Sequence, residues 1–467
     1  MIQFFKLPDR VFYCVSYIVF ALPLVVFYAY CMPAFQVPDE SSHFARAYQL
    51  THGEFFPTKR QVPDKPGEYT VGGTVDPGIF TAAGHYIYLQ GGNNVKVMSE
   101  KTALANSVKW QGGEARDTRN VAVYAPTFYA VPALGTMLGQ YFDMSIVDSL
   151  KLSRLMSGLF GVLLFGMAML ILRKGFGIFF VLSLMPMTLA QVASASQDAT
   201  CFAAAALCVA LISTLSPEVP QRARRICLIF TVLLMITIAS ARPPYLALAL
   251  FYLYFAYNFR TKTLFVVECC LSFFVVFMAT ILWSLYVSFY VSVPFGLEGA
   301  NYAQQALLVL QSPLDWVGVL AESWRQRWDF YLYSFIGLVG HLDTGFPPVF
   351  YTFTIFTLCL AFFTSYLSET GGFFRSLYEQ ALAPCMIVIV ALIGIFLVLY
   401  VSWSPVGYPI IEGVQGRYFI PVAFFLALGC ANKALTGYSQ VAYRCMILSF
   451  AMVTAIITPY VVLARYY

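Results

Sequence analysis

Charged residues are scarce in this sequence. Asp, Glu, Lys and Arg make up only 11% of the 467 residues, whereas ordinary globular domains carry roughly 25%. Hydrophobic residues make up 60% and the mean hydropathy is +0.72, so a soluble chain would lack the polar surface needed to cover its core. These figures argue against a soluble enzyme, a disordered chain and a nucleic-acid binder, and they indicate a multi-pass membrane protein.

Several motifs that identify other function classes are missing. The four histidines are scattered without metal-ligand spacing, so we expect no metal site. There is no Walker loop, dinucleotide fingerprint or nucleophile elbow, so ATP-driven transport and serine-hydrolase chemistry have no motif and no cofactor is expected. No internal repeat supports an inverted-repeat transporter. The eleven cysteines lie in or beside apolar runs and are interpreted as small buried residues.

Long apolar runs are what the sequence does contain. A helix that crosses about 30 Å of hydrocarbon needs about 20 mostly apolar residues. The first run, Val11–Met32, is long for a signal-peptide core and no cleavage site follows it, so we interpret it as an uncleaved anchor. The other runs are 152–172, 177–193, 199–215, 226–241, 244–258, 264–293, 348–367, 383–402, 418–432 and 443–464. The sequence therefore predicts an all-α polytopic integral membrane protein with about eleven transmembrane helices, forming one domain over residues 1–467.

Lys and Arg residues in the short loops predict the orientation. The segments that this topology places inside hold twelve of them: Lys6, Arg10, Arg173, Lys174, Arg222, Arg224, Arg225, Arg260, Lys262, Arg375, Lys433 and Arg444. The short outer segments hold three: Arg242, Arg417 and Arg465. This bias puts the N-terminus inside and the C-terminus outside.

Two long polar regions are expected on the outer side. Residues 33–150 form the first outer loop, and within it the apolar stretch Val121–Phe142 contains prolines and glycines, so we interpret it as an interfacial helix. A transmembrane span there would reverse every later loop and put the basic group at 222–225 outside. Residues 294–347 form the second outer loop, whose Trp and Arg residues favour a helix on the membrane surface.

The densest group of ionisable residues directly follows the first span, in the stretch Pro38–Arg46. A proline followed by acidic residues is typical of a helix start, so Asp39 and Glu40 are expected in the first turn. Helical spacing puts Asp39, His43 and Arg46 on one face. Carboxylates at the outer membrane border suit general-base catalysis or binding of sugar hydroxyls, and an N-cap with a solvated charged face is the alternative.

Four further groups at the outer border are candidate binding residues. In the functional interpretation, the arginines bind a lipid phosphate and the aromatic rings stack on a sugar. The alternatives are snorkelling to head groups, a plain turn, a helix cap and a membrane-interface aromatic belt. The candidates are Gln415, Arg417 and Tyr418 in one group, Arg242 and Tyr245 in a second, Asp198 in a third, and Tyr124 in the fourth.

The order of these motifs resembles the C-type glycosyltransferase superfamily of multi-pass enzymes that use polyprenyl-phosphate sugars. The resemblance rests on one anchor helix, a large outer loop that opens with an acidic pair, the Tyr124-x-Pro-x-x-Tyr129 segment, and Ser153-Arg154-Leu155 entering the second span. The Pro-Asp-Glu stretch, Ser196-x-Asp198 and Gly416-Arg417-Tyr418 also resemble a bacterial family of predicted multi-pass membrane proteins without an assigned function.

The resemblance implies an inverting, metal-independent sugar transfer on the extracytoplasmic face of the bacterial inner membrane. The donor would be a polyprenyl-phosphate sugar, and the acceptor a surface polysaccharide or lipid-linked glycan such as O-antigen or a wall polymer. Asp39 would be the general base, and Glu40 would orient the base or the acceptor. Arg417 corresponds to the basic residue near the donor phosphate, with Arg242 and Arg154 as further candidates. The second acidic residue of the family's first loop has no clear match.

Two other functions share parts of this pattern. A carrier or flippase for a lipid-linked saccharide would need polar or ionisable residues in the middle of its spans, and the spans here are nearly free of charge. A polysaccharide polymerase or ligase would share the outer-face geometry and would use a diphosphate-linked oligosaccharide as donor.

Overall fold

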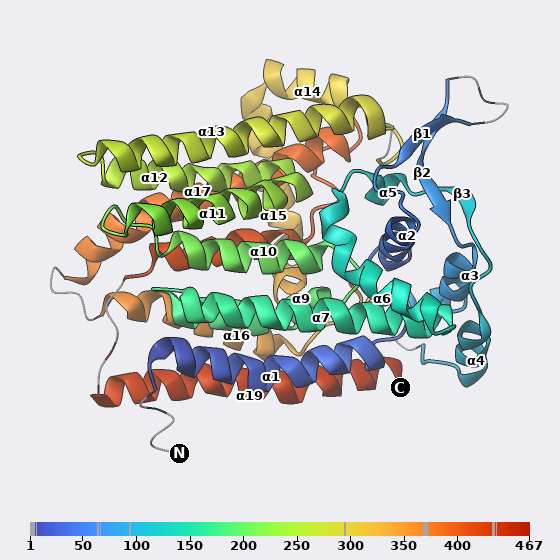
Figure 1. Ribbon diagram of the computed structural model, residues 1–467, viewed down its shortest axis with the longest axis horizontal. Helices are drawn as coiled ribbons and strands as arrows, with labels where there is room; N and C mark the ends of the chain where they lie inside the picture. The colour runs from blue at the N-terminus through green and yellow to red at the C-terminus, as the bar shows by residue number, and fades with distance from the viewer. Residues whose placement is uncertain are drawn as a thin grey trace.

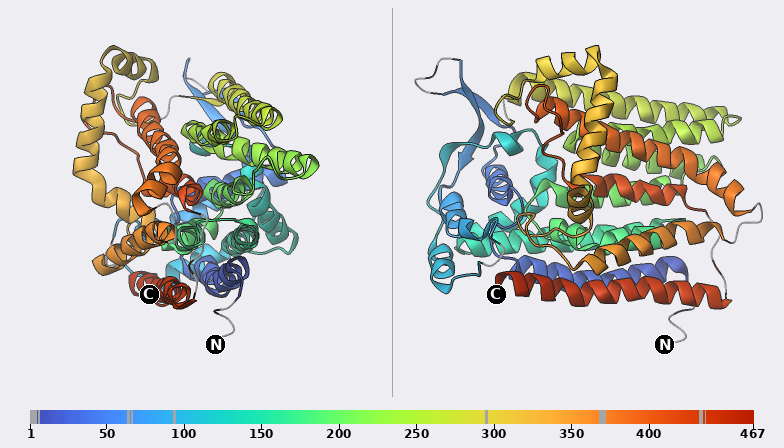
Figure 2. Two further views of the ribbon diagram at one scale, coloured as in Figure 1. Left: turned by 90° about the vertical axis from the view of Figure 1, so that its left-hand side faces the viewer. Right: turned by 180° about the vertical axis from the view of Figure 1, so that it is seen from behind.

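The molecule is a bundle of long helices that run roughly parallel, with a layer of short elements over one end (Figure 1). The computed structural model describes residues 5, 7–62, 65, 67–92, 95–293, 296–367, 372–431, 435 and 437–467. Helix α1 begins at one end of the bundle and α19 finishes at the other (Figures 1 and 2). Lys6 and Lys433, two of the inner basic residues counted above, lie outside the described residues.

Within the described residues, seven helices are long and apolar enough to cross a membrane. They are α1 (Asp9–Cys31), α7 (Ile146–Ile171), α11 (Gln221–Ala241), α13 (Thr263–Tyr286) with the π-turn η5 (Val287–Val291), α16 (Pro348–Phe363) with η6 (Thr364–Tyr366), α17 (Phe373–Ser402) and α19 (Gly437–Tyr466). The pair α9 (Pro186–Val192) and α10 (Gln197–Ile212) is bent by 115° and adds an eighth if it is counted as one span. The chain is thus a multi-pass membrane protein.

The other predicted spans are helical but short or broken. They correspond to α8 (Phe176–Leu184) with α9; η4 (Pro243–Ala249) with α12 (Leu250–Asn258); and η7 (Gly416–Phe419) with α18 (Ile420–Ala423) and η8 (Phe424–Gly429). Proline lies at the first or second position of α9, η4 and α18, where it cannot donate the hydrogen bond of a continuous helix. The total of eleven spans therefore stays a prediction.

Residues 33–142, called the cap here, cover one end of the bundle (Figure 1). The cap contains α2 (Glu40–Thr51), β1 (Thr58–Gln61), β2 (Tyr69–Val75), α3 (Gly78–Gly84), η2 (Ile87–Leu89), α4 (Ser99–Ser107), β3 (Glu114–Asp117), α5 (Arg119–Ala122), η3 (Pro126–Tyr129) and α6 (Ala130–Tyr141). The strands form an antiparallel sheet in the order β1-β2-β3, in which Thr58 pairs with Gly72 and Gly72 with Asp117.

The expected interfacial helix over 121–142 is three short helical segments. The chain is extended at Ala125 before Pro126, which ends the preceding turn. Helix α6 then packs closely on α7, because a Cβ on Gly135 would lie only 2.5 Å from Cα of Ser153. The second long loop also contains helices, α14 (Tyr302–Gln311) and α15 (Pro313–Ile336). Helix α15 carries the tryptophans noted above and runs across the bundle direction (Figure 2).

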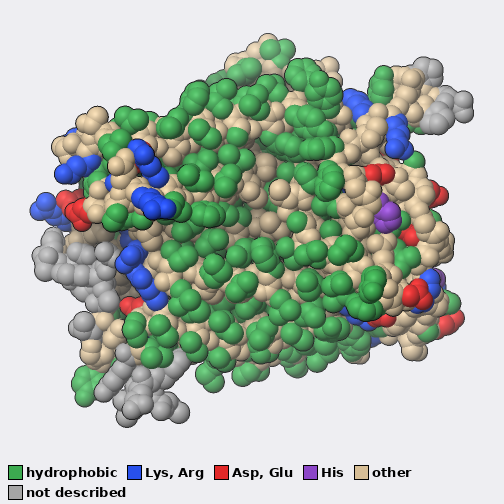
Figure 3. All heavy atoms as spheres, in the orientation of Figure 1, with side chains coloured by type: hydrophobic (Ala, Val, Ile, Leu, Met, Phe, Trp, Pro, Cys, Tyr) green, Lys and Arg blue, Asp and Glu red, His purple; other side chains and the backbone are tan. Residues whose placement is uncertain are grey.

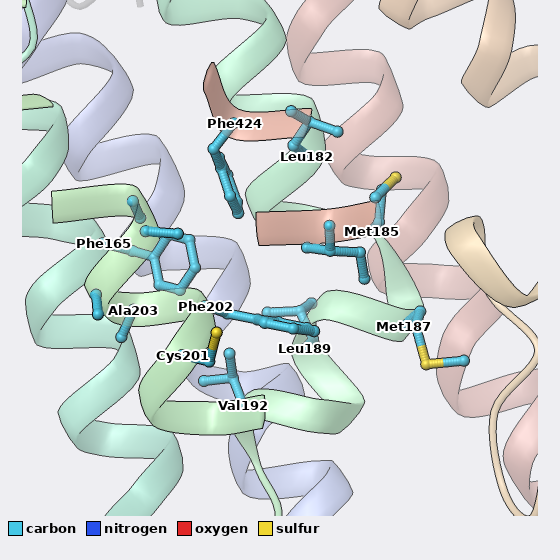
Figure 4. Close-up of a cluster of buried hydrophobic side chains, with 14 of the residues drawn as sticks. Phe165, Leu182, Met185, Met187, Leu189, Val192, Cys201, Phe202, Ala203 and Phe424 are labelled. Atoms are coloured by element: carbon cyan, nitrogen blue, oxygen red, sulfur yellow. The ribbon is translucent and has the colours of Figure 1, made fainter. Parts of the chain in front are cut away.

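Aromatic and aliphatic side chains fill the middle of the bundle. Phe165 of α7 lies with its ring centroid 5.4 Å from that of Phe424 in η8, and both side chains are fully buried. Leu182 of α8 and Phe202 of α10 extend the same cluster (Figure 4). On the surface, hydrophobic side chains cover the middle of the bundle, while charged side chains gather at its two ends (Figure 3). This distribution matches a bilayer around the middle, and it leaves the cap end as the polar end opposite the start of α1.

Candidate functional site

A cavity of about 430 Å³ lies where the cap meets the ends of the bundle helices. Its polar wall includes Asp39 at the start of α2, Arg242 before η4, and Gln415 and Tyr418 around η7. Its apolar wall is formed by prolines of η4 and aliphatic residues of α17. The lining, called the central cavity below, consists of Asp39, Arg119, Asn120, Val123, Tyr124, Ala241, Arg242, Pro243, Pro244, Val291, Ser292, Val293, Tyr302, Ile395, Val398, Leu399, Ser402, Trp403, Gly413, Gln415 and Tyr418.

Asp39 faces this cavity from an uncommon backbone conformation. It is the N-cap of α2 with φ of +60°, in the left-handed region, which Asp tolerates better than most residues. Its side chain is 54% exposed, and Oδ2 lies 3.7 Å from Nη2 of Arg417. Asp39 was expected in the first helical turn beside Glu40. Because it precedes the helix in a left-handed conformation, the two carboxylates diverge.

Glu40 points into the protein and pairs with Arg154 of α7. Its carboxylate oxygens accept hydrogen bonds from Nε and Nη2 of Arg154 at 2.8 and 2.5 Å, and both side chains are fully buried. Arg154 also donates to the carbonyl oxygens of Met32 and Pro33. This bidentate pair fixes the segment between α1 and α2 against α7. The geometry favours a structural role for both residues over the predicted contacts with acceptor and donor.

Asp198 joins the two arginines of the site. Its Oδ2 accepts a hydrogen bond from Nη1 of Arg417 at 3.1 Å, and its Oδ1 lies 3.7 Å from Nη2 of Arg242. Its side chain is only 4% exposed and stands in the first turn of α10, where the helix dipole favours negative charge. Asp39, Asp198, Arg242 and Arg417 together carry no net charge, so the buried charges are compensated.

Arg242 is held from several sides and still borders the cavity. Its guanidinium carbon lies 3.7 Å from the ring centroid of Tyr418, and its Nη1 donates to the Tyr124 hydroxyl at 3.4 Å. The Tyr245 hydroxyl in turn donates to the Tyr418 carbonyl at 2.7 Å. Arg417 is more deeply buried, at 3% exposure, and its Nε donates to Oε1 of Gln415 at 2.6 Å. Of Arg242 and Arg417, Arg242 is therefore the one that borders the cavity and can contact a ligand there.

His43 and Arg46 differ in their relation to the site. The imidazole Nδ1 of His43 lies 2.8 Å from the Tyr129 hydroxyl, and burial lowers the pKa of His43 to about 4 although Asp39 raises it. His43 is thus neutral near pH 7. Arg46 shares neither this contact nor the cavity, because its guanidinium binds Oε1 of Gln49 and the carbonyls of residues 54 and 55. These bonds give Arg46 the role of holding the chain after α2, and its predicted common face with Asp39 and His43 stays a prediction.

A smaller side cavity of about 210 Å³ shares Val123, Ala241, Pro243 and Ser292 with the central cavity. Its remaining lining comes from the ends of α11 and α13 and from η5. The site therefore combines an exposed carboxylate, a guanidinium that can hold an anion, and apolar walls that can accept a hydrocarbon chain. Among the described residues, no three His, Cys, Asp or Glu side chains come together as metal ligands.

Several lining residues were not predicted from the sequence. Asn120, Tyr302 and Trp403 line the cavity but lie just outside the motifs that drew attention. Tyr129, the partner of His43, was noted only as part of an aromatic segment. A Trp at the end of a long apolar helix is typical of an interface anchor, so the sequence did not indicate that Trp403 lines a cavity.

Comparison with known proteins identifies a family without a described activity. The family model described as "Predicted membrane protein (DUF2142)" matches residues 22–426. No curated protein and no solved structure matches the chain.

Proposed function

We propose that this chain, which belongs to the DUF2142 family of predicted membrane proteins, is a glycosyltransferase of the bacterial inner membrane. The enzyme acts on the extracytoplasmic face. It transfers a sugar from a polyprenyl-phosphate donor to a surface polysaccharide or lipid-linked glycan, with inversion at the sugar carbon. The C-type arrangement of about eleven spans belongs to the same proposal.

The observation that carries the proposal is the position of Asp39 in the central cavity. Its carboxylate is half-exposed and lies beside Arg417, and the same cavity is bordered by the guanidinium of Arg242. A general base must be ionised and must reach the proton that it removes. Nη2 of Arg417 lies 3.7 Å from Oδ2 of Asp39, so the guanidinium can hold this carboxylate in position beside the cavity. Exposure leaves the carboxylate accessible to an acceptor hydroxyl.

The reaction uses these groups in one displacement. The acceptor hydroxyl oxygen bonds to the anomeric carbon while the bond from that carbon to the phosphate oxygen breaks. Asp39 takes the hydroxyl proton, and the electron pair leaves with the phosphate. Arg242 stabilises the charge that develops there. Arg417 and Asp198 hold Asp39 and Arg242 in place, so the geometry favours Arg242 over Arg417 as the phosphate ligand.

The apolar wall suits the isoprenoid part of the donor. Pro243 and Pro244 of η4 line the central cavity together with aliphatic residues of α17, and Pro244 packs against α17 beside Gly394. A lipid-linked donor can enter between helices from the bilayer, with its tail on this wall and its phosphate at Arg242. Such a donor also needs no nucleotide site, which agrees with the missing nucleotide motifs.

Charge placement favours this enzyme over a carrier. Among the described residues, buried ion pairs occur near helix ends, as in Arg224–Glu268 and Arg444–Asp9, or at the cap end. A carrier would line its path through the membrane with such groups. A polymerase or ligase that uses a diphosphate-linked oligosaccharide is the alternative, and transfer assays with the two kinds of donor distinguish it from the proposed enzyme.

The test is sugar transfer by the purified protein in proteoliposomes. Undecaprenyl-phosphate monosaccharides and undecaprenyl-diphosphate oligosaccharides are supplied as donors, with surface-glycan acceptors. We expect transfer from the monophosphate donors and its loss in Asp39→Asn with unchanged folding. Asp143→Asn is the matched control, because Asp143 is also left-handed and its side chain is 90% exposed, outside the cavity. Full transfer by Asp39→Asn would remove Asp39 as the base.

A further inference from the structure

The lining of the central cavity changes from aliphatic to polar along α17. Its lining from this helix begins with Ile395, Val398 and Leu399 and ends with Ser402 and Trp403. Eight residues of helix rise by about 12 Å, so the wall passes from aliphatic to polar over about that depth. The polar end lies at the C-terminal end of α17, toward the cap. A molecule that fills this cavity must be apolar at one end and polar at the other.

Four residues of the lining, called the mouth here, are Asn120, Tyr302, Ser402 and Trp403. Ser402 and Trp403 end α17, and the segment before Tyr302 is bonded to this end through Leu297 N and the Trp403 carbonyl. Indole and phenol rings offer flat apolar faces with a polar edge. The Asn120 amide offers two donors and an acceptor, and it makes no hydrogen bond with the part of the chain that the structure describes. Flat rings beside amide and hydroxyl groups match the C–H faces and hydroxyl groups of a sugar ring.

The mouth is also held in a fixed shape. Gly413, at φ of +78°, lies so close to Trp403 that a Cβ would be 2.7 Å from the indole Cδ1. The Trp403 carbonyl accepts a hydrogen bond from Leu297 N at 3.2 Å. The neighbouring Glu412 carboxylate forms a bidentate pair with Arg327 of α15. An ordered aromatic wall loses little entropy on binding, which favours affinity.

We infer that the mouth binds a saccharide unit of the acceptor glycan. One sugar ring stacks on Trp403, and its hydroxyl groups bond to the Asn120 amide. The next hydroxyl points inward to Asp39, which lines the same cavity. This inference rests on the proposed function, because only a transferase makes the bound glycan an acceptor. The binding itself requires no donor and no sugar transfer.

The test is glycan binding by the full-length protein in lipid nanodiscs without any donor. The probe is an array of purified bacterial surface glycans, including O-antigen and cell-wall saccharides, followed by titration of the strongest binder. We expect the wild-type protein to bind, and Trp403→Ala and Asn120→Ala each to weaken binding by about tenfold or more, as for a central contact. Trp324→Ala is the control, because Trp324 is 51% exposed on α15 and lines a separate apolar groove.

The outcomes separate this inference from the proposed function. The inference is overturned if the wild-type protein binds no glycan on the array, or if binding survives both mouth substitutions. Asn120→Ala changes a partly exposed side chain, so it keeps the test decisive if Trp403→Ala unfolds the rim. Glycan binding without transfer from any donor would overturn the enzyme and leave the saccharide site standing. Sugar transfer with an unaltered KM for the acceptor in Trp403→Ala and Asn120→Ala would overturn the saccharide site and leave the enzyme standing.

Discussion

Replacing Glu40 with Gln removes the negative charge that faces Arg154. The pair is joined at 2.5 and 2.8 Å with both side chains fully buried, so water does not screen the uncompensated guanidinium that remains. Breaking a buried ion pair by removing one partner costs about 3–5 kcal/mol. Arg154 keeps its bonds to the carbonyls of Met32 and Pro33, which offset part of the loss. We therefore expect Glu40→Gln to lower the free energy of unfolding by about 3 kcal/mol.

The assay is equilibrium unfolding of the detergent-solubilised protein by SDS, followed by circular dichroism. Asp39→Asn is the matched control, since Asp39 is half-exposed and Asn also tolerates the left-handed region. Its expected effect is about 1 kcal/mol or less, because water screens the half-exposed Asp39 charge and Asp198 still pairs with Arg417. The double variant Glu40→Gln/Arg154→Met should lose less than the sum of the single losses, because neither charge is left alone. Equal destabilisation by Glu40→Gln and Asp39→Asn would refute the division between a structural and a catalytic carboxylate.

Two further predictions concern the cap. Burial lowers the pKa of His43 to about 4, so the unfolded chain, with a His pKa of about 6.5, takes up the proton first. The free energy of unfolding of the wild-type protein should therefore fall by roughly 3 kcal/mol as pH falls from 6.5 to 4. In SDS unfolding, the free energy of unfolding of His43→Gln should fall less over the same pH range. Equal pH dependence of the two proteins would contradict the buried neutral imidazole. Gly135→Val should destabilise α6 against α7 by about 1–3 kcal/mol, while Gly318→Val, which meets open space, should unfold like the wild type.

The sequence predicted the helices well because the signal is strong and local. A run such as Val11–Met32 satisfies its backbone hydrogen bonds in a bilayer by forming a helix, and α1 covers it up to Cys31. The small sheet was missed because β1 and β3 are short, polar and exposed along their whole length, so no alternation of apolar and polar residues marks them. Broken spans were missed because a run's length does not show where proline interrupts it.

The candidate site was predictable in its members and less so in their roles. Asp39, Asp198, Arg242 and Arg417 come from distant parts of the chain, and the structure brings them into one cluster. The predicted topology put all four at the same end of the bundle, because residues at the same ends of spans lie in one layer. The pairing of Glu40 with a residue 114 positions away depends on how two helices pack, which spacing within one helix does not reveal.

The central claim is that the cavity binds the phosphate of a lipid-linked donor at Arg242, beside Asp39. The most direct measurement compares the binding of undecaprenyl phosphate and undecaprenol to the protein in nanodiscs, for the wild type and Arg242→Gln. We expect the wild type to bind the phosphate form at least about tenfold tighter, since hydrogen bonds to charged groups contribute about 1.5–3 kcal/mol, and we expect Arg242→Gln to remove this preference. Equal binding of the two lipids by the wild type, or an unchanged preference in Arg242→Gln, would contradict it.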